Sequence, residues 1–74
     1  MDTTEITKVI EANAVVLGAG ESEDRTAKLI TRAAQMIGFG VGVAEIRDML
    51  LTEGLTEESA FLTFQAARVF LRDA

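Results

Sequence analysis

The residues best suited to binding chemistry in this chain are three cations, Arg25, Lys28 and Arg32, spaced three and four apart. A helix with 3.6 residues per turn places all three side chains on one face. Guanidinium groups bind phosphate and carboxylate oxygens in pairs, so this cationic stripe is a candidate site for an anionic ligand such as a nucleotide. The charged side of any amphipathic helix has the same spacing, and a solvated face is the simpler interpretation.

Catalytic residues are harder to find. The chain contains no Cys, His or Tyr, which leaves Ser, Thr, Lys and carboxylates as possible nucleophiles and bases. Ser22 and Ser59 fall where helices are expected to begin, and helix capping accounts for a hydroxyl there. Glu45 and Asp48 share a helix face, but nothing near them in the sequence argues for a catalytic environment. We therefore expect a protein that is not an enzyme and that carries no cofactor and no metal ion, since Cys and His are the usual ligands of zinc.

Residues 15–20, Val-Val-Leu-Gly-Ala-Gly, are similar to the strand and glycine turn that open a dinucleotide-binding unit. That motif needs a third glycine where this chain has Glu23, and the acidic residues after Gly20 would repel phosphate. The chain is also too short for the fold. We expect the end of a helix here, although residues 14–17 could alternatively form a short strand.

A second glycine motif has Gly38, Gly40 and Gly42 at alternate positions around Phe39 and Val41. Such a segment could clamp a ligand or allow two backbones to approach closely. The simpler interpretation is a loop that joins two helices, with Phe39 turned inward as an anchor.

Composition limits the classes of partner. The chain has 74 residues, 49% of them hydrophobic, and twelve acidic against seven basic residues give a net charge of −5. This charge opposes binding to nucleic acid or to anionic lipid. The first residues lack the pattern of a signal peptide, and the longest uncharged run, residues 33–44, is shorter than the roughly 20 residues that span a bilayer. We expect a cytoplasmic protein with no membrane and no nucleic-acid partner.

Glycine positions and capping residues predict an all-α fold. We expect one domain over residues 1–74, a compact bundle of four short helices at about 4–17, 23–37, 43–53 and 57–72. Gly54 should end the third helix in a left-handed conformation, with Leu55 packed on Leu50. Thr56 should cap the fourth helix immediately afterwards, so the last two helices form a tight hairpin. On the third helix, Val43, Ile46, Met49 and Leu50 should face inward, and Glu45, Asp48 and Thr52 outward.

Part of the chain resembles ubiquitin-associated domains, which are three-helix modules with a Met-Gly-Phe loop and a second loop that opens the last helix. The resemblance lies in Met36-Ile37-Gly38-Phe39, in residues 44–50 and in Gly54 to Ala60, about half of the chain. Ile37 interrupts the Met-Gly-Phe order, the segments are longer than in that family, and the first helix has no counterpart. We therefore do not assign the chain to the family.

The apolar pattern predicts self-association. The fourth helix is apolar almost all round, and three short helices cannot cover it completely in so small a chain. We expect a homo-oligomer, most simply a twofold dimer, formed by Val15, Val16, Leu62, Val69 and Phe70. The predicted function is a non-catalytic interaction or regulatory accessory protein that binds itself or another protein and could inhibit or sequester it. The alternative is a small-molecule binder that holds an anion on the cationic stripe, at an oligomer interface.

Overall fold

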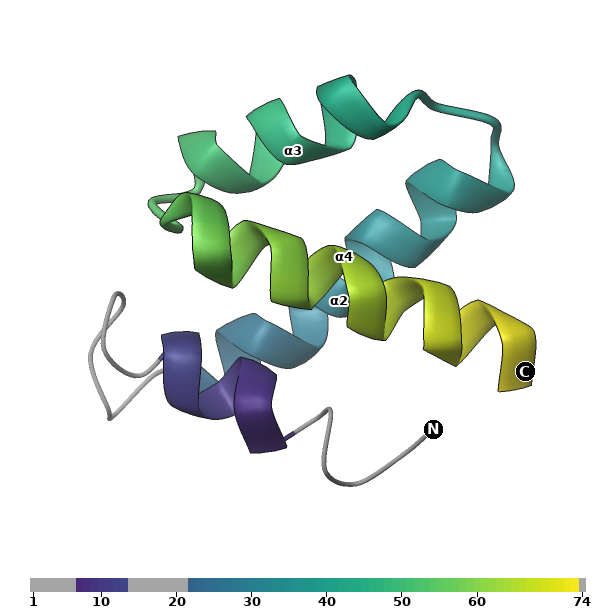
Figure 1. Ribbon diagram of the computed structural model, residues 1–74. Coiled ribbons are helices and arrows are strands. Elements are labelled where there is room, and N and C mark those ends of the chain that lie inside the picture. The colour runs from purple at the N-terminus through teal and green to yellow at the C-terminus, as the bar shows by residue number, and fades with distance from the viewer. Residues whose placement is uncertain (1–6, 14–21, 74) are drawn as a thin grey trace.

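The described part of the chain is entirely helical where it is regular. The computed structural model describes residues 7–13 and 22–73, and all structural statements below concern these residues (Figure 1). Residues 7–13 are helical and are followed by α2 (Ser22–Gly38), α3 (Val43–Thr52) and α4 (Glu57–Asp73). The predicted all-α bundle is thus confirmed. The remainder of the predicted first helix, and the alternative strand at residues 14–17, lie outside the described residues.

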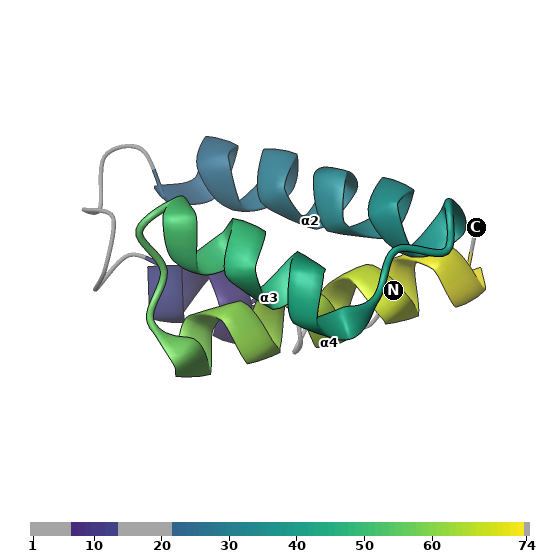
Figure 2. The same ribbon diagram turned by 90° about the horizontal axis from the view of Figure 1, so that it is seen from above.

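The helices are arranged around the contact between α2 and α4, which is the most extensive among α2, α3 and α4. α3 runs antiparallel beside α4 and touches α2 less, and residues 7–13 lie at the opposite side of α4 from α3 (Figures 1 and 2). The short connection between α3 and α4 is the predicted hairpin. Every helix therefore contributes to a core that lies between α2 and α4.

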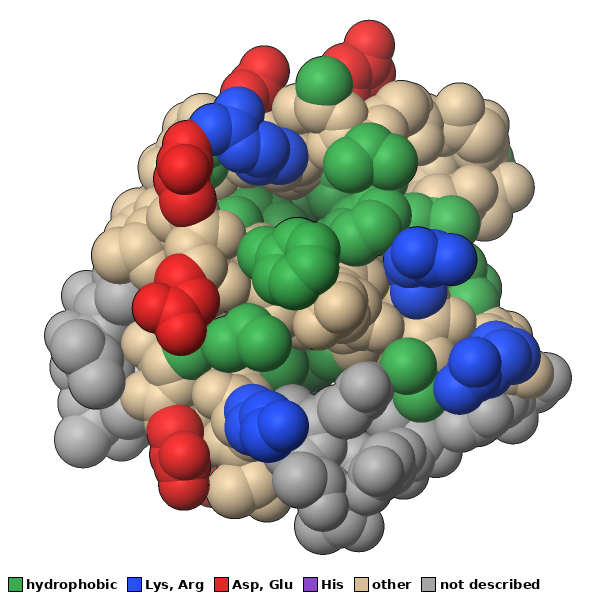
Figure 3. Space-filling view, viewed as in Figure 1, with side chains coloured by type: hydrophobic (Ala, Val, Ile, Leu, Met, Phe, Trp, Pro, Cys, Tyr) green, Lys and Arg blue, Asp and Glu red, His purple; other side chains and the backbone are tan. Residues whose placement is uncertain are grey.

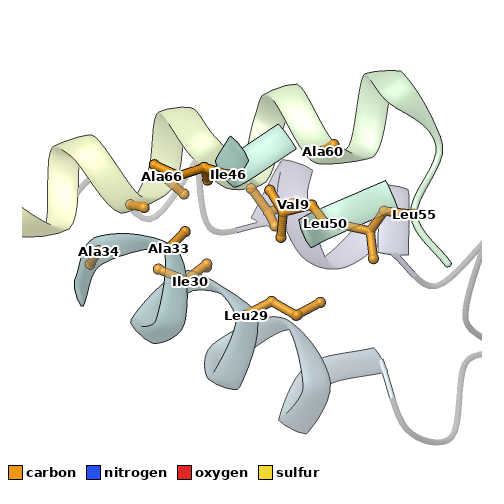
Figure 4. Close-up of a cluster of buried hydrophobic side chains, with 11 residues drawn as sticks. Val9, Leu29, Ile30, Ala33, Ala34, Ile46, Leu50, Leu55, Ala60 and Ala66 are labelled. Carbon is orange, nitrogen blue, oxygen red and sulfur yellow. The ribbon is translucent and has the colours of Figure 1, made fainter. Parts of the chain in front are cut away.

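The core is built from small and aliphatic side chains (Figure 4). Five of its eleven buried apolar residues are alanines, and all five belong to α2 or α4. Alanine leaves little volume between two helices, so their axes can approach closely. The remaining space is filled by branched side chains from residues 7–13, α2 and α3, and from Leu55 just before α4. The buried apolar residues are Val9, Leu29, Ile30, Ala33, Ala34, Ile46, Leu50, Leu55, Ala60, Ala66 and Ala67.

Gly54 ends α3 in the conformation that the sequence predicts. Its φ angle is 98°, which a residue with a side chain adopts only at a cost. Its N–H donates to the carbonyl of Leu51, and the N–H of Leu55 donates to the carbonyl of Leu50, which together make a Schellman motif. Leu55 and Leu50 are both buried, and the Thr56 hydroxyl accepts the N–H of Ser59 as the predicted cap of α4.

The end of α2 repeats the same motif with Gly40 in the left-handed position, at φ 82°. The N–H of Val41 donates to the carbonyl of Met36, and the N–H of Gly40 donates to that of Ile37, each across 3.0 Å. Gly38 was predicted to lie in the loop, but it is the last residue of α2 because the left-handed turn comes two residues later.

Two predictions about apolar side chains are wrong. Phe39 does not turn inward but is 88% exposed, because the Schellman motif directs the residue after its glycine, Val41, back against the core instead. Val43 is 61% exposed although its helical period is that of Ile46 and Leu50. It occupies the first turn of α3 and lines an open groove. Met49 is half-buried, and Glu45, Asp48 and Thr52 face outward as predicted.

Gly38 and Gly40 test whether glycine is required by the left-handed backbone conformation at the end of α2. A Cβ at Gly38 or at Gly40 would meet nothing within 4 Å, so only the backbone conformation distinguishes them. We expect Gly40→Ala to lower the free energy of unfolding by about 1 kcal/mol, or the melting temperature by roughly 4–8 °C. Gly38→Ala should raise stability by up to about 1 kcal/mol, because alanine favours the helix. Thermal unfolding followed by circular dichroism measures both, and equal effects would contradict the assignment of Gly40.

Candidate functional site

The cationic stripe is partly occupied by a carboxylate of the chain itself. Arg25 Nη2 lies 3.1 Å from Glu53 Oε2, and Arg32 Nη1 lies 3.0 Å from Glu53 Oε1. Arg25 also donates to the main-chain carbonyl of Glu53 across 3.4 Å. Lys28 is exposed and lines the same hollow of about 600 Å³. The three predicted cations thus do share one surface, and Glu53 is the member of this cluster that the sequence did not identify.

Through Glu53, the two arginines stabilise the end of α3. Glu53 is the last residue before Gly54, at the carbonyl end of α3, where a positive charge interacts favourably with the helix dipole. The arginines therefore hold this end of α3 against α2. An incoming anion would meet guanidinium groups whose nearest hydrogen-bonding positions already carry carboxylate oxygens, and it would have to displace Glu53.

Replacement of Glu53 by Gln distinguishes the role of the stripe in holding α3 against α2 from a role in binding an anion. We expect Glu53→Gln to reduce the free energy of unfolding by less than about 1 kcal/mol, because the ion pairs are partly exposed. Inorganic pyrophosphate should bind the variant more tightly than wild type in calorimetric titration, and Arg25→Glu with Arg32→Glu should abolish that gain. Glu23→Gln, an exposed acid on α2, controls for net charge. Equal affinities of wild type and Glu53→Gln protein would contradict competition by Glu53.

A second cluster of polar residues lies inside the bundle. The Ser59 hydroxyl donates to Oδ1 of Asn13 across 2.7 Å, and the Thr63 hydroxyl donates to the carbonyl of Ser59. Ser59 was predicted to act as a helix cap, but Thr56 does so and Ser59 is buried instead, where it joins α4 to residues 7–13. Its partner is an amide oxygen, which cannot accept a proton as a catalytic base does.

Two buried polar atoms of the described residues have no hydrogen-bond partner. They are Nδ2 of Asn13 and Oγ1 of Thr26. A buried polar group without a partner destabilises the fold by about 1–3 kcal/mol. The described residues also contain no group of three or more Asp, Glu, His or Cys side chains that could hold a metal ion.

These buried atoms predict opposite effects for two conservative substitutions. Thr26→Val replaces the unpartnered hydroxyl by a methyl group of similar size, so we expect the free energy of unfolding to rise by about 1 kcal/mol. Ser59→Ala removes a donor and leaves Asn13 without its hydrogen bond. The free energy of unfolding should therefore fall by about 1–3 kcal/mol. Urea denaturation measures both changes. Destabilisation by Thr26→Val as large as that by Ser59→Ala would show that the Thr26 hydroxyl has a partner in solution.

An apolar hollow lies between α3 and α4, and we call it the α3–α4 groove. Its volume is about 250 Å³, and Figure 3 shows hydrophobic side chains gathered over this seam. Arg47 and Glu57 form an ion pair at its rim, and the Arg68 guanidinium lies 6.0 Å from the centre of the Phe64 ring. The groove is lined by Val43, Arg47, Glu57, Ala60, Phe61 and Phe64.

A second apolar hollow lies where the ends of α2 and α4 meet. Phe39, Phe70 and Leu71 are its large side chains, and all three are exposed. No charged residue lines it, since the others are Thr31, Ala34, Gln35 and Gly38. This end patch and the α3–α4 groove have no lining residue in common.

Of the predicted interface residues, Leu62 and Phe70 line different hollows. Leu62 lies beside Lys8, Glu11 and Ala12, whereas Phe70 lies beside α2 and, in one of its two hollows, beside Ile10. Leu62 and Val69 are half-buried, and Phe70 is 42% exposed. Val15 and Val16 lie outside the described residues. Sequence reasoning missed Phe61 and Val43 as exposed groove residues because their apolar character predicted burial.

Comparison of the chain with family models, with curated proteins and with solved structures gives no significant match. The resemblance to ubiquitin-associated domains therefore has no support from a family model, and the fold includes a helical segment at residues 7–13, with Val9 in the core, beyond the three helices of such a module. Among the described residues, no helix is both long and apolar enough to cross a bilayer. The geometry of the surface is thus the basis for a functional proposal.

Proposed function

We propose that this chain is a non-catalytic interaction protein that associates with a second copy of itself through exposed aromatic surface. The observation that carries the proposal is the placement of the four phenylalanines. Phe39, Phe61 and Phe70 are exposed and Phe64 is half-buried, while the core consists of Ala, Val, Ile and Leu. Phenylalanine is among the residues most often buried in proteins, so its exclusion from the core indicates a role on the surface.

The energy of covering these rings is large enough to drive association. Burial of a Phe side chain contributes about 1.5–3 kcal/mol, and a symmetric contact uses each ring twice. The loss of translational and rotational freedom opposes binding, and several rings together can exceed it. Phe is also among the residues that are enriched at interfaces relative to the rest of the protein surface.

Charge restricts where a second copy of the chain can make contact. Two chains of net charge −5 repel each other over most of their surface, so contact is favoured where charges are absent or balanced. The end patch has no charged lining residue, and the two charged residues of the α3–α4 groove neutralise each other as an ion pair. The apolar surfaces are therefore also the places where repulsion is weakest.

The same surfaces could engage another protein and thereby inhibit or sequester it, which is the regulatory role that we propose for the assembled chain. Binding of an anion such as a nucleotide is the second candidate, and the cationic stripe with Lys28 would carry it. The ion pairs of Glu53 with Arg25 and Arg32 count against this second candidate, so we place it behind self-association.

The proposal predicts a particle of twice the 8.0 kDa chain mass in light scattering at micromolar concentration. Phe61→Asp should reduce that mass to one chain, because an unpaired charge buried in an apolar contact is strongly unfavourable. Helicity should be retained, since Phe61 is 59% exposed in the single chain. Gln65→Asp adds the same charge one turn later at an exposed position and should leave the dimer intact. A wild-type mass of one chain, with full helicity, would refute self-association.

A further inference from the structure

We propose that the Phe39 ring of one copy inserts into the α3–α4 groove of a second copy. This inference rests on the proposed self-association and specifies its contact. It joins the most exposed large apolar side chain of the described residues to a hollow that two phenylalanines line. Within the single chain the ring is exposed to water, and no described residue fills the groove.

The Phe39 ring is held on a well-defined support. Its own N–H donates to the carbonyl of Gln35 across 3.0 Å, and the two Schellman hydrogen bonds of Gly40 and Val41 follow directly. Val41 packs against the core and fixes the other side of the loop. A backbone that is already ordered before binding loses little conformational entropy on contact, so the ring is pre-organised for insertion.

The space around this ring is open to a partner. A Cβ placed at Gly38, Gly40 or Gly42 would meet nothing within 4 Å, so neighbouring atoms do not enclose the loop. Of the three, only Gly40 needs glycine for its own backbone conformation, because Gly42 has extended angles that any residue adopts. Glycine at the two other positions has no internal structural reason, and it lets a second chain approach the backbone beside Phe39.

The α3–α4 groove fits an aromatic ring in size and chemistry. Its volume of about 250 Å³ exceeds the roughly 150 Å³ of an apolar cavity that binds benzene. Phe61 and Phe64 offer ring faces and edges to an incoming ring, and Val43 and Ala60 supply aliphatic contact. The Arg47–Glu57 ion pair stays at the rim, where water and the partner's uncharged loop surround it.

The position of the loop allows a reciprocal contact. Val43, which lines the groove, follows Phe39 by only four residues, so the ring and the groove belong to adjoining parts of the molecule (Figure 1). Two copies related by a twofold axis can then each offer a ring to the other's groove. The residues from 38 to 44 carry no charge, which limits repulsion between two acidic chains.

Photo-crosslinking tests this contact directly. Replacement of Phe39 by p-benzoylphenylalanine keeps an aromatic ring and adds a group that bonds to nearby C–H positions on illumination. The variant is mixed with wild-type chain labelled with ¹⁵N, so crosslinks between copies are identified by mass. We expect these crosslinks at groove residues of the partner copy, chiefly Val43, Ala60, Phe61 and Phe64. The same group at position 70 is the matched control, and it should crosslink elsewhere.

The effect of losing the ring gives a second measurement. Phe39→Ala should raise the dimer dissociation constant by tenfold or more, while Phe39→Leu should raise it less. Both variants should keep their helicity, because the side chain is 88% exposed in the single chain and has little contact to lose. If the wild-type protein is a dimer but the crosslinks from position 39 lie outside the groove, or no crosslink forms between copies, this inference is overturned and self-association still stands. A wild-type protein that is monomeric by light scattering would reject the proposed function itself.

Discussion

The close contact of α2 with α4 through alanine side chains is the constraint on which the rest of this structure depends. Ala33 and Ala34 of α2 and Ala66 and Ala67 of α4 are completely or almost completely buried at this contact. Small residues bring the two helices together, and a close-packed interior has no room for a larger ring. α3 and residues 7–13 then cover the two sides of α4 with aliphatic side chains, so the core is complete without any phenylalanine.

The surface follows from this core. Phenyl rings that cannot enter it lie along the α3–α4 groove and at the end patch. Inside the bundle, Asn13 and Ser59 tie the N-terminal segment to α4, whereas the buried Thr26 hydroxyl of α2 has no partner. Arg25 and Arg32 hold the end of α3 through their ion pairs with Glu53. An apolar surface with balanced charge is thus a product of the same packing that stabilises the single chain.

The sequence predicts those features that are encoded locally. Gly54, Leu55 and Thr56 define the α3–α4 turn within a few residues, so this turn and the helix bounds were predicted closely. Glu53 lies 28 positions from Arg25, and Asn13 lies 46 positions from Ser59, and no local pattern links such pairs. The exposure of Phe39 and Val43 could not be predicted either, because helical periodicity gives the direction of a side chain but not whether another element covers it. Leu62 and Phe70 line different hollows, which their shared apolar character does not reveal.

The alanine contact also determines how the fold responds to temperature. Unfolding changes the heat capacity mainly in proportion to the apolar area that becomes hydrated. A chain that buries methyl groups, and already exposes its aromatic rings to water, hydrates little additional apolar area when it unfolds. Its heat capacity increment per residue should therefore lie below the usual value of about 12–15 cal/mol/K. The stability curve of the single chain is then broad and shallow, so moderate cooling or warming changes the folded population only slightly.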